Sequence, residues 1–447
     1  MILPLARKNY SVWKQKFKNI SNITPDVKKL VSDMRETLDL TSGVGLAAPQ
    51  IGQPLRLFII NFGKLREVFI NPKIITYGKE KDQLEEGCLS VPGSRGVVKR
   101  STGLEMEYED LKGTRKRASL KGYYARIAQH EYDHLSSIFY VDRITDKKKI
   151  HTYKPIKIVF FGTPEFGAII LKSLYGQHFV GDYKLQLVVT SPDKPSGRGK
   201  EPALSVVKKT AASFGLPIAQ PVSLNNPAFI NSLKKLKPDF IVLAAYGKII
   251  PKSILRIPSK AAINVHPSLL PKYRGASPIS TAILNGDKFT GVTIINMNEK
   301  IDEGDILASV KLPISAKATT QSLAKKLAVA ASRLIHHVLH LYSAGKIKPR
   351  PQEGGRPTYT RLLKKEGGFI DWQNPPENLN QMVRAYFPWP GVWTRLPAPD
   401  GAASGGQDKN QGKILKLLPN RMVQLEGKKP ISLEEFKAGH ADFTLNW

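Results

Sequence analysis

The pattern of expected secondary structure changes near residues 144–155, where a lysine-rich stretch ends in proline, and this change most constrains the fold. Before it lies a helical pattern followed by short alternating or apolar runs separated by glycine, proline and asparagine, as in antiparallel strands. After it, strand-like runs alternate with helical stretches, which indicates a parallel sheet with crossover helices. A chain of 447 residues is long enough for two or three domains.

The first pattern predicts an α+β domain over residues 1–150. Its first helix spans about 25–40 and begins after Thr24, with a proline and an aspartate in the first turn. A second helix is expected over about 123–138. The strand-like runs between them are Leu55–Asn61, Glu67–Ile70 and Leu104–Tyr108.

The second pattern predicts an α/β domain over residues 155–345. Its strand-like runs are Ile156–Phe161, Leu185–Ser191, Phe240–Ala245, Ala261–Val265 and Val292–Met297. Residues 346–364 are expected to link it to a small β domain, a barrel, over 365–447. The loop at 396–411 has low complexity and is expected to be disordered.

The composition excludes several classes of protein. Hydrophobic residues make up 41% and charged residues 23%, values typical of a globular chain. No apolar run approaches the roughly 18 residues of a membrane span, and the start of the chain lacks the apolar core of a signal peptide. The single cysteine excludes an internal disulfide framework, so we expect a cytoplasmic protein without membrane contact.

The chain is strongly basic, with a formal net charge of +31. The electrostatic field of so much positive charge attracts polyanions such as nucleic acids, even without contacts to the nucleotide bases. A generally basic surface adapted to salt is the alternative. We favour nucleic acid as a partner of the second half, because a separate basic motif also lies there.

His130, Glu131 and His134 form an H-E-x-x-H pattern. On a helix the two histidines project from one face, one turn apart, and can hold one divalent metal beside the glutamate. The alternative is an ordinary solvated helix. The pattern by itself would also fit a metal endopeptidase.

Two further features lie upstream. Cys88 is the only cysteine of the chain. The simplest interpretation is that it is a small hydrophobic residue buried in the core. The glycine-punctuated turn at 43–50 lets the backbone approach a neighbour closely, although a packing turn would look the same.

Taken in order, the segments GVGLAAPQ at 43–50, EGCLS at 86–90 and QHEYDHL at 129–135 resemble the motifs of peptide deformylase. The resemblance covers nearly all of residues 1–145 and implies a metal hydrolase. It implies a metal held by Cys88, His130 and His134, with water at the open fourth position. Ferrous iron is the usual metal of that family, with zinc among the alternatives. Ser137 stands where the family commonly has glycine.

The same resemblance implies the chemistry. Metal-activated water would attack the formyl group of a nascent formyl-methionyl peptide. Gln50 and the backbone N–H of Leu89 would stabilise the oxyanion, and Glu131 would carry the proton to the leaving amine. Gly45 would let the substrate backbone lie against its loop, and Val44 would line the methionine pocket.

In the second half, polar residues end two strand-like runs: Asn264 and His266 on one, and Asp302 after the other. Sites on open α/β sheets lie beyond the carboxyl ends of strands. An amide, an imidazole and a carboxylate suit transfer to an amine, since they stabilise an oxyanion, move a proton and orient the imidazole. A hydrogen-bonded structural histidine is the alternative.

The segments INVHPSLLPKYRGASPI at 263–279 and GVTIINMNEKIDEGDIL at 291–307 resemble folate-dependent formyltransferases. FGTPEF at 161–166 and SPDKPSGRGK at 191–200 narrow the resemblance to methionyl-tRNA formyltransferase. This implies a Rossmann-like catalytic domain, an OB-like C-terminal domain that binds tRNA, 10-formyltetrahydrofolate as donor and initiator methionyl-tRNA as acceptor. It places Asn264, His266 and Asp302 at catalytic positions. The residues implied to flank the folate are Tyr246, Ser268, Leu269, Leu270 and Pro271.

Arg198 and Lys200 lie in the glycine-rich basic loop of this second half. A solvated flexible loop is the plain interpretation. The resemblance favours contact with the acceptor stem of tRNA through its backbone.

We therefore predict a bifunctional translation enzyme that removes formyl groups from nascent peptides, near the ribosome, and installs them on initiator methionyl-tRNA. The alternatives are a chain in which only the formyltransferase half is active, a formyltransferase for a nucleotide or sugar amine, and a non-catalytic RNA-binding protein.

Overall fold

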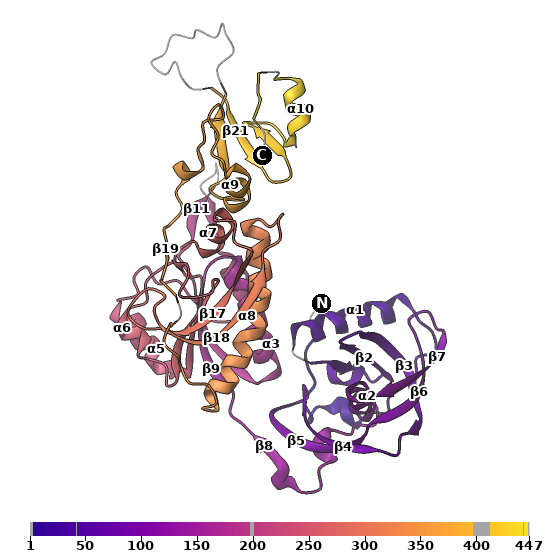
Figure 1. Cartoon of the computed structure of the whole chain (residues 1–447). Coiled ribbons are helices and arrows are strands. Elements are labelled where there is room, and N and C mark those ends of the chain that lie inside the picture. The colour runs from indigo at the N-terminus through magenta and orange to yellow at the C-terminus, as the bar shows by residue number, and fades with distance from the viewer. Residues whose placement is uncertain are drawn as a thin grey trace. The chain divides into compact units, whose positions relative to one another are not determined.

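The computed structural model describes residues 3–41, 43–196, 201–353, 355–396, 412–440, 442–445 and 447. Arg198, Lys200 and residues 397–411 of the low-complexity loop lie outside the described residues. The chain divides into two compact units, the first holding residues 1–157 and 172–185 and the second 158–171 and 186–447. Figure 1 shows the elements of each unit.

The main sheet of the first unit is antiparallel. Within the described residues it has five strands in the order β1-β2-β3-β6-β7. Their bounds are β1 Gly45–Ala47, β2 Leu57–Phe62, β3 Leu65–Tyr77, β6 Gly103–Glu109 and β7 Arg115–Lys121. The three strand-like runs predicted from sequence fall within or across β2, β3 and β6.

Helices α1 (Pro25–Leu40) and α2 (Tyr123–His134) pack against opposite faces of this sheet. Successive side chains of a strand point to opposite faces. Leu57 and Ile59 of β2 accordingly join the apolar face of α1, whereas Phe58 and Ile60 join that of α2. The side-chain hydroxyl of Thr24 accepts a hydrogen bond from the backbone N–H of Val27, so the predicted start of the first helix is confirmed.

A second sheet in this unit carries the sole cysteine. Its described strands are β4 (Lys81–Cys88), β5 (Val91–Ser101) and β8 (Ile150–Thr152), all antiparallel neighbours. Residues 150–152 are thus part of a sheet rather than a free connection. Short 3₁₀ helices complete the unit: η1 Ser11–Lys14, η2 Ala48–Ile51, η3 Tyr140–Asp142 and η4 Lys147–Lys149.

The helix expected over 123–138 ends earlier, at His134. Ser137 adopts φ 56°, in the left-handed region that stops a helix. Its hydroxyl donates a hydrogen bond to the backbone oxygen of Trp13 at 2.8 Å. A glycine, common here in the resembled family, would reach this conformation without strain.

The second unit is built on a sheet whose described strands, seven in number, follow the order β13-β10-β9-β14-β15-β17-β18. The bounds are β9 Ile156–Gly162, β10 Tyr183–Val189, β13 Ile218–Ala219, β14 Phe240–Ala244, β15 Ala261–His266, β17 Phe289–Asn296 and β18 Asp305–Pro313. The helices that lie wholly or, in the case of α3, partly in this unit are α3 Glu165–Val180, α4 Val206–Ser213, α5 Pro227–Leu236, α6 Lys252–Leu255, α7 Pro278–Leu284 and α8 Thr320–Ser343.

The predicted parallel sheet is confirmed only in part. Strands β9, β14 and β15 run parallel, as do β10 and β13, but β17 runs antiparallel to both β15 and β18. The link between β17 and β18 is a short turn at 297–304, and such a turn can join only antiparallel strands. The sheet is therefore mixed.

Two small pairings lie beside this sheet. Strands β11 (Lys194–Ser196) and β12 (Glu201–Ala203) pair in antiparallel fashion. Strand β16 (Arg274–Gly275) pairs in parallel with β19 (Tyr359–Thr360).

The C-terminal part forms a small antiparallel sheet. The strands described there are β20 Val392–Arg395, β21 Ile414–Leu418, β22 Met422–Leu425 and β23 Ile431–Ser432, in that order. The helices η5 Lys365–Gly368, α9 Leu379–Ala385 and α10 Leu433–Ala438 accompany them. The core of this part combines sheet residues such as Leu415 and Val423 with Phe436 of α10.

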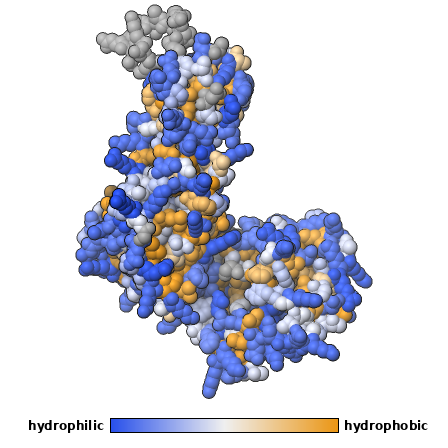
Figure 2. All heavy atoms as spheres, viewed as in Figure 1, coloured by the Kyte–Doolittle hydropathy of each residue, from blue (hydrophilic) through white to orange (hydrophobic). Residues whose placement is uncertain are grey.

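The surface agrees with the charged composition. In Figure 2 most of the visible surface of both units is hydrophilic, with apolar residues interspersed. Among the described helices, none is long and apolar enough to cross a membrane.

Candidate active sites

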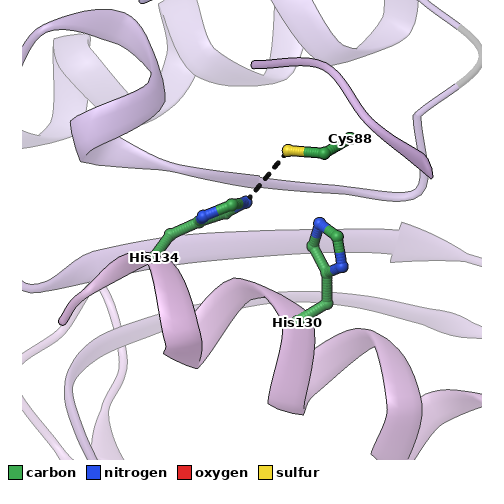
Figure 3. Close-up of side chains that lie close together, drawn as sticks. All are labelled: Cys88, His130 and His134. Atoms are coloured by element: carbon green, nitrogen blue, oxygen red, sulfur yellow. Dashed lines mark hydrogen bonds between the residues drawn. The ribbon is translucent and has the colours of Figure 1, made fainter. Parts of the chain in front are cut away.

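Cys88, His130 and His134 come together in the first unit. Cys88 ends strand β4, and the two histidines lie one turn apart on α2. Their ligand atoms all lie within 4.8 Å of one another, and the sulfur of Cys88 is 3.3 Å from Nε2 of His134 (Figure 3). One thiolate and two imidazoles form a donor set suited to a tetrahedral metal with one open position.

His130 is oriented by a carboxylate that the sequence reasoning missed. Its Nδ1 lies 2.9 Å from Oε2 of Glu86, which leaves Nε2 for a metal. Glu86 also accepts hydrogen bonds from Arg100 and Arg126. Although burial raises the pKa of Glu86, the bonds from His130 and Arg100 lower it well below its usual range. A hint existed in the sequence, because alternate residues of a strand share a face and Glu86 precedes Cys88 by two positions.

His134 is fully buried, and burial lowers its pKa well below the usual value. A metal ligand must be a neutral imidazole, so this environment suits metal binding. Within the described part of the chain its Nδ1 has no hydrogen-bond partner. The donor set and its surroundings therefore fit a divalent metal.

Glu131 lies against the glycine turn. It is 4% exposed, and burial raises its pKa to about 7. A Cβ on Gly45 would lie 2.5 Å from Oε1 of Glu131. Gly45 therefore makes room for this carboxylate, a role that differs from the substrate contact expected from the resemblance.

Gln50 is buried, and its side chain is fixed at both ends. Its Oε1 accepts a hydrogen bond from the backbone N–H of Ala47 at 2.7 Å, and its Nε2 lies 3.6 Å from the sulfur of Cys88. A cavity beside the metal ligands is lined by several of the residues predicted from sequence. These are Val44, Gly45, Gln50, Cys88, Leu89, His130 and Glu131.

The second unit brings together Asn264, His266 and Asp302. The first two share a face near the end of β15, and Asp302 lies in the turn between β17 and β18. Oδ1 of Asp302 accepts a hydrogen bond from Nδ2 of Asn264 at 3.0 Å. Oδ2 of Asp302 lies 3.4 Å from Nδ1 of His266. Burial lowers the pKa of His266, against the opposing effect of Asp302.

The remaining nitrogen of His266 is also engaged, since Nε2 lies 2.9 Å from the backbone oxygen of Tyr273. The loop that carries Tyr273 also contains Ser268, whose hydroxyl donates to the backbone oxygen of Lys272. Leu270 donates its backbone N–H to Thr293 of β17. This loop is thus held against the sheet beside the histidine.

Among the residues expected to flank a folate, Leu269, Leu270 and Pro271 line a surface groove. Ser268 is buried, and Tyr246 is 2% exposed and packs edge-to-face on Phe161 in a separate apolar cluster. The structure thus places Tyr246 among core residues rather than with the groove.

Each half of the chain matches the model of a known protein family. Residues 156–339 match the family model described as formyl transferase, residues 362–420 match the formyl transferase C-terminal domain, and residues 2–150 match polypeptide deformylase. Fold and sites therefore define an enzyme with a peptide deformylase domain followed by a formyltransferase domain.

The methionyl-tRNA formyltransferase of Roseiflexus castenholzii is 40% identical over 305 residues, which cover 64% of this chain and 96% of that protein. That of Thermodesulfovibrio yellowstonii is 41% identical over 298 residues, covering 63% and 95%. This chain belongs to the methionyl-tRNA formyltransferase family, and its additional deformylase domain makes it a bifunctional translation enzyme.

Solved structures resemble the first domain. A peptide deformylase from Synechococcus elongatus, in complex with actinonin, is 35% identical and aligns over 33% of this chain and 81% of its own, with a TM-score of 0.32. The peptide deformylase from Thermotoga maritima is 34% identical over 32% of this chain and 99% of its own, with a TM-score of 0.32.

Proposed function

We propose that this enzyme removes the formyl group from nascent formyl-methionyl peptides and transfers formyl from 10-formyltetrahydrofolate to initiator methionyl-tRNA. The single observation that carries the proposal is the occurrence of two complete polar clusters in one chain. One is Cys88 with His130 and His134, and the other is Asn264 with His266 and Asp302. Each has the chemistry that its family requires.

In the deformylase domain, Cys88, His130 and His134 would hold the metal, which we propose is ferrous iron, with zinc as the alternative. A bound divalent metal supplies Lewis-acid activation of water. Val44 and Gly45 would line the peptide site.

The buried polar groups around that metal site would perform the remaining steps. Gln50 and the backbone N–H of Leu89 would donate hydrogen bonds to the oxygen of the formyl group as negative charge develops. Glu131 would pass a proton to the leaving amine, a role favoured by its raised pKa of about 7.

In the formyltransferase domain, His266 would accept the proton of the attacking amine while Asp302 orients its imidazole. Asn264 would stabilise the oxygen of the transferred formyl group. The proposed folate-flanking residues are Ser268, Leu269, Leu270 and Pro271, together with the strand end at Tyr246. Because the ring of Tyr246 is buried in the core, we propose that its backbone rather than its side chain faces the folate.

For recognition of tRNA, we propose that Arg198 and Lys200 contact the acceptor stem. We also propose that the domains span 1–150, 155–345 and 365–447, with a linker at 346–364. The C-terminal antiparallel sheet would then belong to an OB-like domain that binds tRNA. The role in translation supports action in the cytoplasm, near the ribosome.

The test is a pair of assays on the intact chain, loaded with ferrous iron and protected from oxygen. One assay measures formate released from a formyl-methionyl peptide, and the other measures formyl-methionyl-tRNA formed with 10-formyltetrahydrofolate. Cys88→Ala should abolish only the first activity, and His266→Ala only the second. Elemental analysis of the same sample identifies the metal.

Other outcomes would favour the alternatives. Preference for a nucleotide or sugar amine would contradict the tRNA substrate. Internal cleavage of peptides would indicate an endopeptidase. Retention of tRNA without either turnover would indicate an RNA-binding protein.

A further inference from the structure

The segment expected to be a linker runs along the proposed transfer site. The backbone of Arg350 exchanges two hydrogen bonds with Ile306, at the start of β18. Ten residues further on, β19 pairs with β16 in the loop that follows His266. Arg350 and strand β19 therefore contact the two loops that carry Asp302 and follow His266.

Gln352 makes the central contacts of this segment. Its Nε2 donates to the backbone oxygens of Asp302, at 2.7 Å, and Gly304, at 2.8 Å. Its Oε1 accepts from Nε of Arg274 at 3.1 Å and from Nη2 of Arg274 at 2.8 Å. A side-chain amide offers two donor hydrogens and one acceptor oxygen, so these four contacts use every polar position.

The turn that Gln352 contacts has an unusual conformation. Asp302 adopts φ 53°, a left-handed conformation that costs energy for a residue with a side chain. Gly304 has no room for a Cβ, which would collide with the backbone oxygen of Asn296. Such a conformation persists only where its surroundings hold it, and the amide of Gln352 holds two of its carbonyls.

The conformation of this turn sets the direction of the catalytic carboxylate. One oxygen of Asp302 accepts from Asn264, and the other accepts from the backbone N–H of Gly275 at 2.8 Å and faces His266. If the backbone at Asp302 rotated toward a common conformation, the carboxylate would leave these partners. In the described part of the chain, the side chain of Gln352 hydrogen-bonds to Arg274 and to backbone oxygens, and not to the side chains of Asn264, His266 or Asp302.

We propose that Gln352 is a positioning residue for formyl transfer, acting through the backbone of Asp302 to keep its carboxylate on Asn264 and His266. The inference rests on the proposed function of this site and adds to it a residue about fifty positions away in sequence. Arg274 fixes the amide of Gln352 from its other side, and so determines which end of that amide faces the turn.

Two variants separate positioning from simple chain anchoring. Gln352→Glu keeps an acceptor for Arg274 but has no hydrogen to donate to the two carbonyls. Gln352→Met has a side chain of similar shape but can neither accept hydrogen bonds from Arg274 nor donate them to the two carbonyls. Gln321→Met is the matched control, because Gln321 is exposed at the start of α8 in the same unit and lies outside both proposed sites.

The readouts are kcat and KM for methionyl-tRNA formylation by the intact chain. We expect both Gln352 variants to lose about 10- to 100-fold in kcat, because displacement of a catalytic group by about 1 Å costs on the order of 100-fold. KM for tRNA and for the folate should change less than about twofold, and the control should match the wild type. Hydrogen exchange across residues 298–306 should accelerate in both Gln352 variants and not in the control.

A double-mutant cycle tests the route through Asp302. Under single-turnover conditions, Asp302→Asn combined with Gln352→Met should be no slower than Asp302→Asn alone. Multiplied losses, or a kcat within twofold of wild type for Gln352→Glu, would overturn the proposal. An unmodified chain that formylates no methionyl-tRNA would instead contradict the proposed function. In that case the hydrogen-exchange measurement still tests the positioning role. Unchanged exchange rates across residues 298–306 in the Gln352 variants would overturn it.

Discussion

Gly45 and Glu131 show how the absence of one side chain shapes the first site. A buried carboxylate with a raised pKa needs an enclosed position, and Gly45 provides it by having no Cβ. Oε2 of Glu131 is buried and, within the described residues, has no hydrogen-bond partner. Space and an unpaired oxygen are what a group that receives and releases a proton requires.

Substitution of Gly45 by alanine should displace Glu131, because the new Cβ would stand 2.5 Å from its Oε1. We expect formate release from a formyl-methionyl peptide to fall by about 10-fold or more, since a small misplacement of a catalytic group is costly. Metal content should remain unchanged. Gly103→Ala is the control in the same unit, because its Cβ would have only an ordinary contact of 3.7 Å. Equal activity of the two variants would show that the position of Glu131 does not matter.

Glu131→Gln keeps the shape of the side chain and removes its ability to move a proton. Deformylation should fall by about 10²- to 10⁴-fold, the usual contribution of general acid–base catalysis. Metal content and tRNA formylation, measured on the same protein, should be retained. If Glu131→Gln released formate at nearly the wild-type rate, Glu131 would not be the residue that transfers the proton.

Helix α8 carries a histidine that should make the stability of the protein depend on pH. It runs from Thr320 to Ser343 and buries one face, which includes Leu327, Ala331 and Ile335, in the second unit. Burial, together with the neighbouring His340, lowers the pKa of His336 to about 4. In the unfolded chain the same imidazole would titrate near its ordinary value of about 6.5.

Because the folded pKa of His336 lies below the unfolded one, the unfolded state binds the proton more readily. Stability should therefore decrease as the pH falls from above 6.5 toward 4, by up to about 2 kcal/mol between pH 8 and pH 5 from this group. His336→Gln should lose that part of the pH dependence in urea unfolding experiments. The exposed neighbour offers the control variant His337→Gln, which should keep the wild-type slope. Identical slopes for all three proteins would contradict the lowered pKa of His336.

At the scale of the whole molecule, one chain holds two sites with different requirements. Only the first has, among the described residues, a cluster of side chains able to hold a metal. The second relies on an amide, an imidazole and a carboxylate supplied by the chain itself. The two activities should therefore respond independently to metal removal.

A strong chelator should abolish deformylation and leave tRNA formylation at the wild-type rate. It should also lower the stability of the first unit, because a metal that binds only the folded state stabilises it. Both activities and thermal unfolding can be followed on one sample before and after chelation, with ferrous iron added back as the control. A parallel loss of formylation would indicate that the second site also depends on the metal.

The parts of each site that could be predicted from sequence are those set by local geometry. His130 and His134 lie one turn apart on a helix, and Asn264 and His266 lie two residues apart on a strand, so each pair shares a face. The glycine turn near Gly45 was also recognisable. These relations follow from the periods of helix and strand and need no knowledge of the fold.

Other parts depended on contacts between distant segments. Glu86 meets Arg100 and Arg126 because β4, β5 and α2 adjoin, which no local period indicates. The turn at 297–304 explains why β18 is antiparallel to β17, but the antiparallel pairing of β17 with β15 is a property of the whole sheet. Gln352 lies on a stretch whose composition suggested only a linker, and its role came from pairing with loops far away in sequence.

Motifs in the sequence indicated two enzymatic halves, and their resemblance to known families implied the metal ligands of the first half and the polar trio of the second. Backbone periodicity alone brought together only the near neighbours, His130 with His134 and Asn264 with His266. The orientation of each group became known from the folded chain: which carboxylate contacts His130, why position 45 must lack a side chain, and which amide contacts the turn at Asp302. Orientation depends on sheet register and loop packing, which arise from many weak contacts between distant segments.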